Sequence, residues 1–186
     1  MALNRKIAYI DLGTGKVNIE PIPPEWRRKF IGGRGLDAYL LYRNAPPGCD
    51  PLGPDNPLLI SAGLLVGTMA SASARTHVMA KSPLTHLLGS ANMGGFFAPE
   101  MRWAGFDHLV IKGRAEKPVY LFIHDGEIEI RSAQNVWGSG VYDSQEIIRR
   151  ELDDLEAQVL CIGQAGENLV RFACVRHGRK SAAGRG

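Results

Sequence analysis

The sequence predicts an α+β fold that forms a single domain over residues 1–186. Short runs of strand character outnumber helical segments, turn residues join some of these runs as hairpins, and strands and helices do not alternate as they do in a doubly wound fold. An apolar share of 45% supplies enough hydrophobic residues for a core. The 22 glycines show no collagen period, so they indicate many tight corners.

Turn residues organise the predicted strands. Gly13-Thr14-Gly15 joins the first two runs as a hairpin, and Asp125-Gly126 is a strong signal for a second one. The turn-like sequence GQAGEN separates the last two runs. The predicted strands are residues 6–12, 16–22, 57–65, 76–81, 109–112, 119–124, 127–131, 157–162 and 169–175.

Helical spacing of apolar residues predicts helices over residues 23–30, 36–42 and 144–155. Pro24 suits the first turn of the first helix, and the glycines in residues 32–35 are expected to end that helix. Pro46 is expected to stop the second helix. Asp143 and Glu146 give the third helix the spacing of a capping box.

Charge and hydropathy narrow the class of protein. The net charge of +3 does not by itself imply nucleic acid, and the basic C-terminal cluster lacks interleaved aromatic residues. Residues 171–186 contain no Asp or Glu, so this end of the chain either binds an anion or is a solvated basic tail. The N-terminus has no signal-peptide pattern and no apolar run is long enough to span a bilayer, so we expect a cytoplasmic protein without a membrane partner.

Two glycine-rich corners are the main candidates for a binding site. They are residues 90–95 (SANMGG), reached by a strand that begins after Arg75, and residues 178–186 (GRKSAAGRG). Glycine lets the backbone approach a ligand, peptide N–H groups bind phosphate oxygens, and an arginine can grip a phosphate with two hydrogen bonds. Neither corner matches G-x-G-x-x-G after a strand or a Walker A loop. From the residues alone, a tight turn in which Arg75 pairs with Glu100 or another acid is slightly favoured over an anion site.

Histidines and cysteines offer no catalytic constellation, and no catalytic residue is assigned. His77, His86 and His124 have no acid or cysteine at a recognisable spacing, which indicates structural roles, whereas His177 beside the basic cluster is the best placed of the histidines to contact a ligand. The three cysteines are far apart and lack C-x-x-C spacing, which argues against a disulfide framework, a zinc site or an iron–sulfur cluster held by them alone.

Several motifs in order resemble a known family. They are residues 82–123 (SPLTHLLGSANMGGFFAPEMRWAGFDHLVIKGRAEKPVYLFI) and residues 162–186 (IGQAGENLVRFACVRHGRKSAAGRG), together with GGRGL and DPLGPDNPLLISAGLLVGT. The chain resembles, over almost its whole length, the N-terminal domain of the aldehyde:ferredoxin oxidoreductases. This resemblance implies an α+β base with two β-sheets flanked by helices, which carries tungstopterin: two pyranopterin dithiolenes around one tungsten, or molybdenum in some relatives.

The resemblance also implies a reaction and its partners. The metal oxidises an aldehyde and water to a carboxylic acid, and a [4Fe-4S] cluster passes the electrons to ferredoxin or to an iron–sulfur partner subunit, within a homodimer or a hetero-oligomer. The family's cluster cysteines lie in later domains that this sequence does not contain, so the chain alone is expected to be inactive. A non-catalytic pterin-binding module or fragment is the alternative.

Site residues follow from the resemblance by position. Arg75 matches the arginine near the pterin phosphate, and the other cofactor-binding positions are Asn92, Met93, Gly94, Gly95, Ala182, Ala183, Gly184 and Arg185. Backbone carbonyls of Asn92 and Ala182 match ligands of a magnesium ion that bridges the two pterin phosphates.

One departure affects the site. Ser181 stands where close relatives often carry arginine, so one phosphate contact is expected either to be lost or to be taken over by Lys180 or Arg179. The MGGFFAPE and GRKSAAGRG segments are also similar to the branch with the tungsten subunit of benzoyl-CoA reductases.

Overall fold

The computed structural model describes residues 5–184, and a mixed six-stranded sheet forms its centre. Only β1 and β6 run parallel; the other neighbouring strands of this sheet pair antiparallel. In spatial order the strands are β2 (Lys16–Pro21), β1 (Lys6–Asp11), β6 (His108–Lys112), β3 (Leu58–Ala62), β4 (Thr76–Lys81) and β5 (Leu88–Met93). Strand β5 is therefore one edge of the large sheet.

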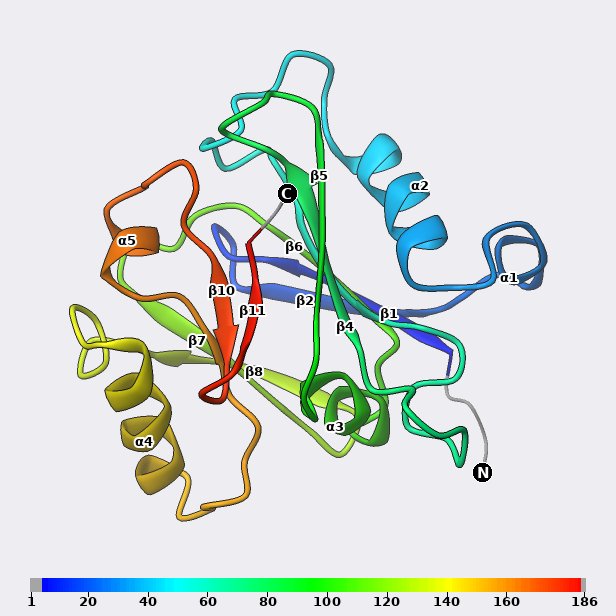
Figure 1. Ribbon diagram of the computed structural model, residues 1–186. Coiled ribbons are helices and arrows are strands. Elements are labelled where there is room, and N and C mark those ends of the chain that lie inside the picture. The colour runs from blue at the N-terminus through cyan, green and yellow to red at the C-terminus, as the bar shows by residue number, and fades with distance from the viewer. Residues whose placement is uncertain (1–4, 185–186) are drawn as a thin grey trace.

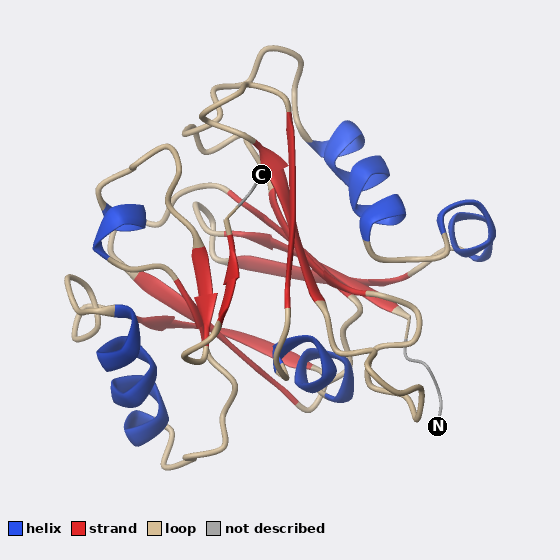
Figure 2. Ribbon diagram, in the orientation of Figure 1, coloured by secondary structure: helices blue, strands red, loops and turns tan. Residues whose placement is uncertain are grey.

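The large sheet buries both faces, because alternate side chains point to opposite sides. Ile7, Leu59 and Met79 pack on one side against the apolar residues of α2 (Arg34–Asn44), and α1 (Pro24–Phe30) precedes this helix. On the other side, Ala8 and Ile10 pack in a second core with residues of α3 (Phe97–Trp103). Figure 2 shows α1 and α2 together on one side of the strands.

Two smaller sheets lie on the α3 side of the large sheet (Figure 1). Strands β7 (Val119–His124) and β8 (Glu127–Ser132) form a hairpin whose apolar side chains join the core with α3. Strands β9 (Leu160–Cys161), β10 (Val175–His177) and β11 (Ser181–Ala183) form the three-stranded sheet, in which β11 is an edge. Helix α4 (Val141–Glu151) packs beside it through Ile148, and α5 (Gln164–Glu167) precedes β10.

The α+β class is confirmed, and the strands among the described residues divide into three hydrogen-bonded sheets. Both predicted hairpins are present. The strand predicted over residues 169–175 is wrong: only Val175 belongs to β10, while Leu169 and Phe172 are exposed in turns and therefore have no sheet to join. GQAGEN contains the short helix α5 rather than only a turn.

Helix starts also differ from the prediction. Asp143 does not cap α4, since Gly140 is the N-cap residue and makes no side-chain hydrogen bond. Helix α2 begins earlier than predicted, after Gly33, whose φ of 52° lies in the left-handed region that glycine adopts without strain. No helix among residues 5–184 has the length and apolar character needed to cross a bilayer.

Candidate functional site

The two glycine-rich corners lie next to each other in the structure. Strand β5 contains most of the first corner and β11 lies in the second, and these two edge strands pack side by side (Figure 1). Met93 of β5 and Ala183 of β11 share a small core with Val78 of β4. Alternate residues of an edge strand direct their N–H and C=O groups away from the sheet, so two such edges together offer unpaired backbone donors and acceptors.

Polar and small residues over these edges remain open. Arg75, Asn92 and Ala182 are exposed, and Arg75 makes no hydrogen bond or ion pair with any residue in the described range 5–184. The alternative in which Arg75 pairs with Glu100 is therefore absent from this structure. The ladder pairs Thr76 with Met93, which places Arg75 beside the turn that begins at Gly94.

The second corner approaches the first closely. A Cβ atom added at Gly94 would lie 3.7 Å from the Ser181 hydroxyl, an ordinary contact distance, so the backbone of the first corner lies within one side chain of the second. Arg179 and Lys180 are exposed in the turn between β10 and β11. Gly184 is exposed, and Arg185 lies outside the described residues.

One buried hydroxyl near the first corner lacks a partner. Thr76 is fully buried, and its Oγ1 has no hydrogen-bond partner among the described residues. Buried polar atoms are normally paired, so an orphan beside an unpaired arginine marks a place where an additional group is expected. The Thr76 hydroxyl, the Arg75 cation and the two backbone edges fit an anionic ligand.

Comparison with known proteins identifies the family. The family model described as aldehyde ferredoxin oxidoreductase, N-terminal domain, matches residues 7–186. The chain belongs to this family. It is 45% identical to a tungsten-containing aldehyde ferredoxin oxidoreductase of Pyrococcus furiosus, over 95% of this chain and 29% of that protein. An aliphatic sulfonate oxidoreductase WOR-like subunit of the same organism is 34% identical, over 100% of this chain and 32% of the relative.

A solved relative has the same fold. A chain of the active site complex BamBC of benzoyl coenzyme A reductase, in complex with 1,5-dienoyl-CoA, superposes with a TM-score of 0.95. It is 39% identical and is covered over 28% of its length, while 98% of this chain is matched. The chain thus spans less than a third of the length of these relatives.

His177 does not face an open site, contrary to the sequence prediction. Its side chain is buried, Nδ1 donates to the Val159 carbonyl at 3.0 Å, and Nε2 accepts from the Phe96 N–H at 3.2 Å. Both ring nitrogens are therefore used within this family domain, and no nitrogen is left to bind a ligand.

His77 belongs to a buried polar cluster that sequence reasoning missed. Its Nδ1 lies 2.5 Å from Asp37 Oδ2, and its Nε2 lies 2.9 Å from the Ser90 hydroxyl of β5. His108 Nδ1 lies 2.7 Å from Asp37 Oδ1, and the Ser61 hydroxyl donates to Oδ2. The structural role predicted for His77 is confirmed, with an acid partner from α2. A carboxylate at position 37 between the buried residues Leu36 and Leu40 was the signal available in the sequence.

The Asp37 carboxylate is charged despite its burial. Burial alone would raise the pKa of Asp37, but hydrogen bonds from His108, His77 and Ser61 outweigh that effect and hold the pKa below its ordinary value. The cluster thus stabilises an anion inside the sheet, under α2.

The other histidines and the cysteines considered in the sequence analysis lie in several different parts of the fold. His86 is exposed in the loop between β4 and β5, and His124 bonds Glu129 across the β7–β8 hairpin at 2.9 Å, so it does have an acid partner. Cys49, Cys161 and Cys174 are free thiols. Burial raises the pKa of Cys161 to about 11, which keeps this thiol protonated and unreactive at neutral pH.

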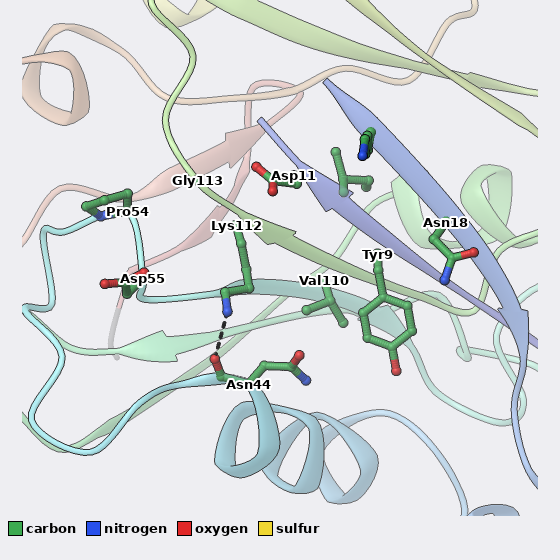
Figure 3. A pocket seen from close by; sticks show the side chains of 11 residues that line it. Tyr9, Asp11, Asn18, Asn44, Pro54, Asp55, Val110, Lys112 and Gly113 are labelled. Carbon is green, nitrogen blue, oxygen red and sulfur yellow. Dashed lines mark hydrogen bonds between the residues drawn. The ribbon is translucent and has the colours of Figure 1, made fainter. Parts of the chain in front are cut away.

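A hollow of about 500 Å³ lies away from the two corners (Figure 3). Tyr9, Asp11, Asn44 and Lys112 are among its lining residues, and none of the predicted cofactor residues within the described range 5–184 is. Lys112 Nζ donates to the Asn44 carbonyl at 3.0 Å, and Asp11 accepts from the N–H groups of its own turn. These polar groups are partly satisfied within the protein, so the hollow is a weaker candidate site than the two edges.

Proposed function

We propose that this chain is the part of a tungsten or molybdenum oxidoreductase that binds a bis-pterin cofactor across the edges of β5 and β11. The observation that carries the proposal is the meeting of two edge strands beside an unpaired arginine and an orphan buried hydroxyl. Family membership supports the identity of the ligand, because the relative from Pyrococcus furiosus is named as tungsten-containing. When bound, the metal with its pterin ligands supplies the redox chemistry.

The chain's own residues have defined tasks in this proposal. Arg75 pairs with a pterin phosphate, and the segments from Asn92 to Gly95 and from Ala182 to Arg185 lie against the cofactor. Backbone carbonyls of Asn92 and Ala182 would hold a magnesium ion, since hard cations prefer oxygen ligands. The exposure of Asn92 and Ala182 on neighbouring edge strands supports this assignment.

The proposed reaction is the oxidation of an aldehyde to a carboxylic acid. A [4Fe-4S] cluster, which the family resemblance assigns to sequence outside this chain, would supply the path for electrons to ferredoxin or to a partner subunit. The chain alone is therefore proposed to bind cofactor without turnover, in a cytoplasmic homodimer or hetero-oligomer.

A second candidate is the tungsten subunit of a benzoyl-CoA reductase-like complex. It is favoured by the TM-score of 0.95 and the 39% identity to the BamBC chain. Purified natural protein distinguishes the two: aldehyde-dependent reduction of a viologen dye supports the first, and turnover only with an aromatic acyl-CoA supports the second. Cofactor binding without either activity supports a non-catalytic pterin module.

Metal and pterin analysis tests the common part of these proposals. The natural protein that contains this chain is purified without oxygen, tungsten and molybdenum are measured by mass spectrometry, and pterin is measured by the fluorescence of its oxidised form. We expect one of the two metals together with pterin. Protein that contains neither metal and no pterin, although its host makes the cofactor, would refute the proposed function.

A further inference from the structure

One buried imidazole connects the β10–β11 hairpin to the segment that follows β5. His177 ends β10, and only 5% of its surface is exposed. The Val159 carbonyl can only accept a hydrogen bond, so Nδ1 carries the ring proton, and the Phe96 N–H can only donate, so Nε2 carries a lone pair. The contacts thus require one neutral tautomer of the ring.

The turn after β5 is shaped around this ring. Gly95 has a φ of 99°, and a Cβ atom added there would lie 2.2 Å from His177 Cδ2 and 2.6 Å from Nε2. Phe97 meets the same ring edge-on, with 6.3 Å between the ring centroids. A side chain larger than hydrogen at position 95 would therefore displace either the turn or the imidazole.

The ring lies next to the turn of the β10–β11 hairpin, which carries the second corner. In the ladder His177 pairs with Ser181, the residue before Ala182. The other described contacts between the β10–β11 hairpin and β5 include the apolar packing of Ala183 against Met93. Apolar contacts are non-directional, whereas the hydrogen bond from Phe96 fixes one position of the hairpin along β5.

We propose that His177 is a positioning residue that fixes the β11 edge relative to the β5 edge, and so sets the spacing between Asn92 and Ala182. The identity of the ligand held at that spacing rests on the proposed function. The role of His177 in fixing the two edges does not depend on the proposed function, because all the contacts that support this role lie within the described chain.

Two amide substitutions separate the two hydrogen bonds of the ring. In His177→Gln the side-chain oxygen reaches the position of Nε2 and accepts from Phe96, whereas in His177→Asn the shorter amide reaches only the position of Nδ1 and donates to Val159. Hydrogen exchange of the peptide that contains Phe96 is measured by mass spectrometry on the natural protein, prepared without tungsten and molybdenum. We expect roughly tenfold to hundredfold faster exchange in His177→Asn, since a buried donor loses its acceptor, and near-normal exchange in His177→Gln.

Cofactor content completes the test. In protein made with tungsten, we expect His177→Asn to retain several-fold less tungsten and pterin than the wild type, and His177→Gln to recover most of it. Equal exchange in all three proteins, or equal cofactor content in all three, would overturn the positioning role. A wild type without metal or pterin would instead refute the proposed function, while the exchange rates would still decide whether His177 connects the strands.

The wild-type protein supplies an independent check if His177→Asn does not fold. Phe96 precedes α3 and lies outside every strand of the described chain, so its amide has no ladder partner. The proposal expects this amide to be protected from exchange as strongly as amides within β10. Exchange at the rate of an unprotected loop amide would contradict it.

Discussion

Strands β4 and β5 carry polar groups in two opposite settings. Under α2, His77 and Ser90 belong to the Asp37 cluster, in which His77 uses both ring nitrogens and Asp37 uses both carboxylate oxygens. At the end of the same two strands, the exposed Arg75 has no partner among the described residues, and neither does the buried Thr76 hydroxyl.

We infer from this difference that the Asp37 cluster serves mainly the stability of the fold, and that the region around Arg75 serves mainly ligand binding. Polar groups that satisfy each other inside the sheet stabilise the native state and leave nothing for a ligand. The exposed Arg75, left unpaired where the two edges meet, contributes little to folding and is available to bind an anion. Substitutions in the first region should therefore reduce stability, and substitutions in the second should reduce cofactor content.

Asp37→Ala is expected to have the largest effect. It removes the acceptor of three buried donors, and each buried donor left without an acceptor costs about 1–3 kcal/mol of unfolding free energy. Denaturation in urea measures this change. The control is Asp55→Ala at an exposed position, which should stay within about 0.5 kcal/mol of the wild type. Equal stability of the two variants would show that the cluster does not support the fold.

Acid should remove the same contribution from the wild type. The pKa of Asp37 is lowered in the folded state, so its carboxylate stabilises the protein above the pKa of the unfolded chain, and this stability is lost as pH falls through the folded pKa. The stability difference between the wild type and Asp37→Asn should therefore shrink as pH falls below about 4. A difference that stays constant down to the acid unfolding range would contradict the assignment.

Arg75→Ala should show the opposite pattern. Loss of a hydrogen bond to a charged group is expected to weaken cofactor retention by about 1.5–3 kcal/mol, while the unfolding free energy of the cofactor-free protein changes by less than about 0.5 kcal/mol. Arg28→Ala in α1 is the matched control, because Arg28 is also an exposed arginine but lies in another element. Unchanged pterin content in Arg75→Ala would remove this residue from the site.

Ser90→Ala tests where the two regions meet, with the smallest expected effect. Ser90 lies two residues before Asn92, but its hydroxyl is hydrogen-bonded to His77 at 2.9 Å. Stability should fall by about 1 kcal/mol, as for one ordinary hydrogen bond, and cofactor content should stay normal. Loss of cofactor from a protein of near-normal stability would show that the boundary between the regions is misplaced.

The sequence predicted local features better than meetings between distant segments. Asp125-Gly126 was sufficient to predict the β7–β8 hairpin, because turn chemistry acts within a few residues. Strands β5 and β11 were read as glycine corners, because small residues have little intrinsic preference for strands and pair here only through their neighbours. The sequence led us to propose the residues of both corners as a site, but it did not show that β5 and β11 are neighbouring edges.

Long-range polar contacts were also outside the reach of sequence patterns. Asp37 and His77 are separated by forty positions, and His177 and Phe96 by more than eighty, so no spacing rule connects either pair. The sequence placed His177 next to basic residues and so predicted a ligand contact. That prediction is wrong, because the side chain is buried inside the protein.

A structure of the natural protein with its cofactor tests the central claim most directly. We predict that a pterin phosphate lies within hydrogen-bond distance of the Arg75 guanidinium, and that the two pterins lie along the edges of β5 and β11. A cofactor bound away from both edges, for example in the hollow lined by Tyr9 and Lys112, would contradict the account.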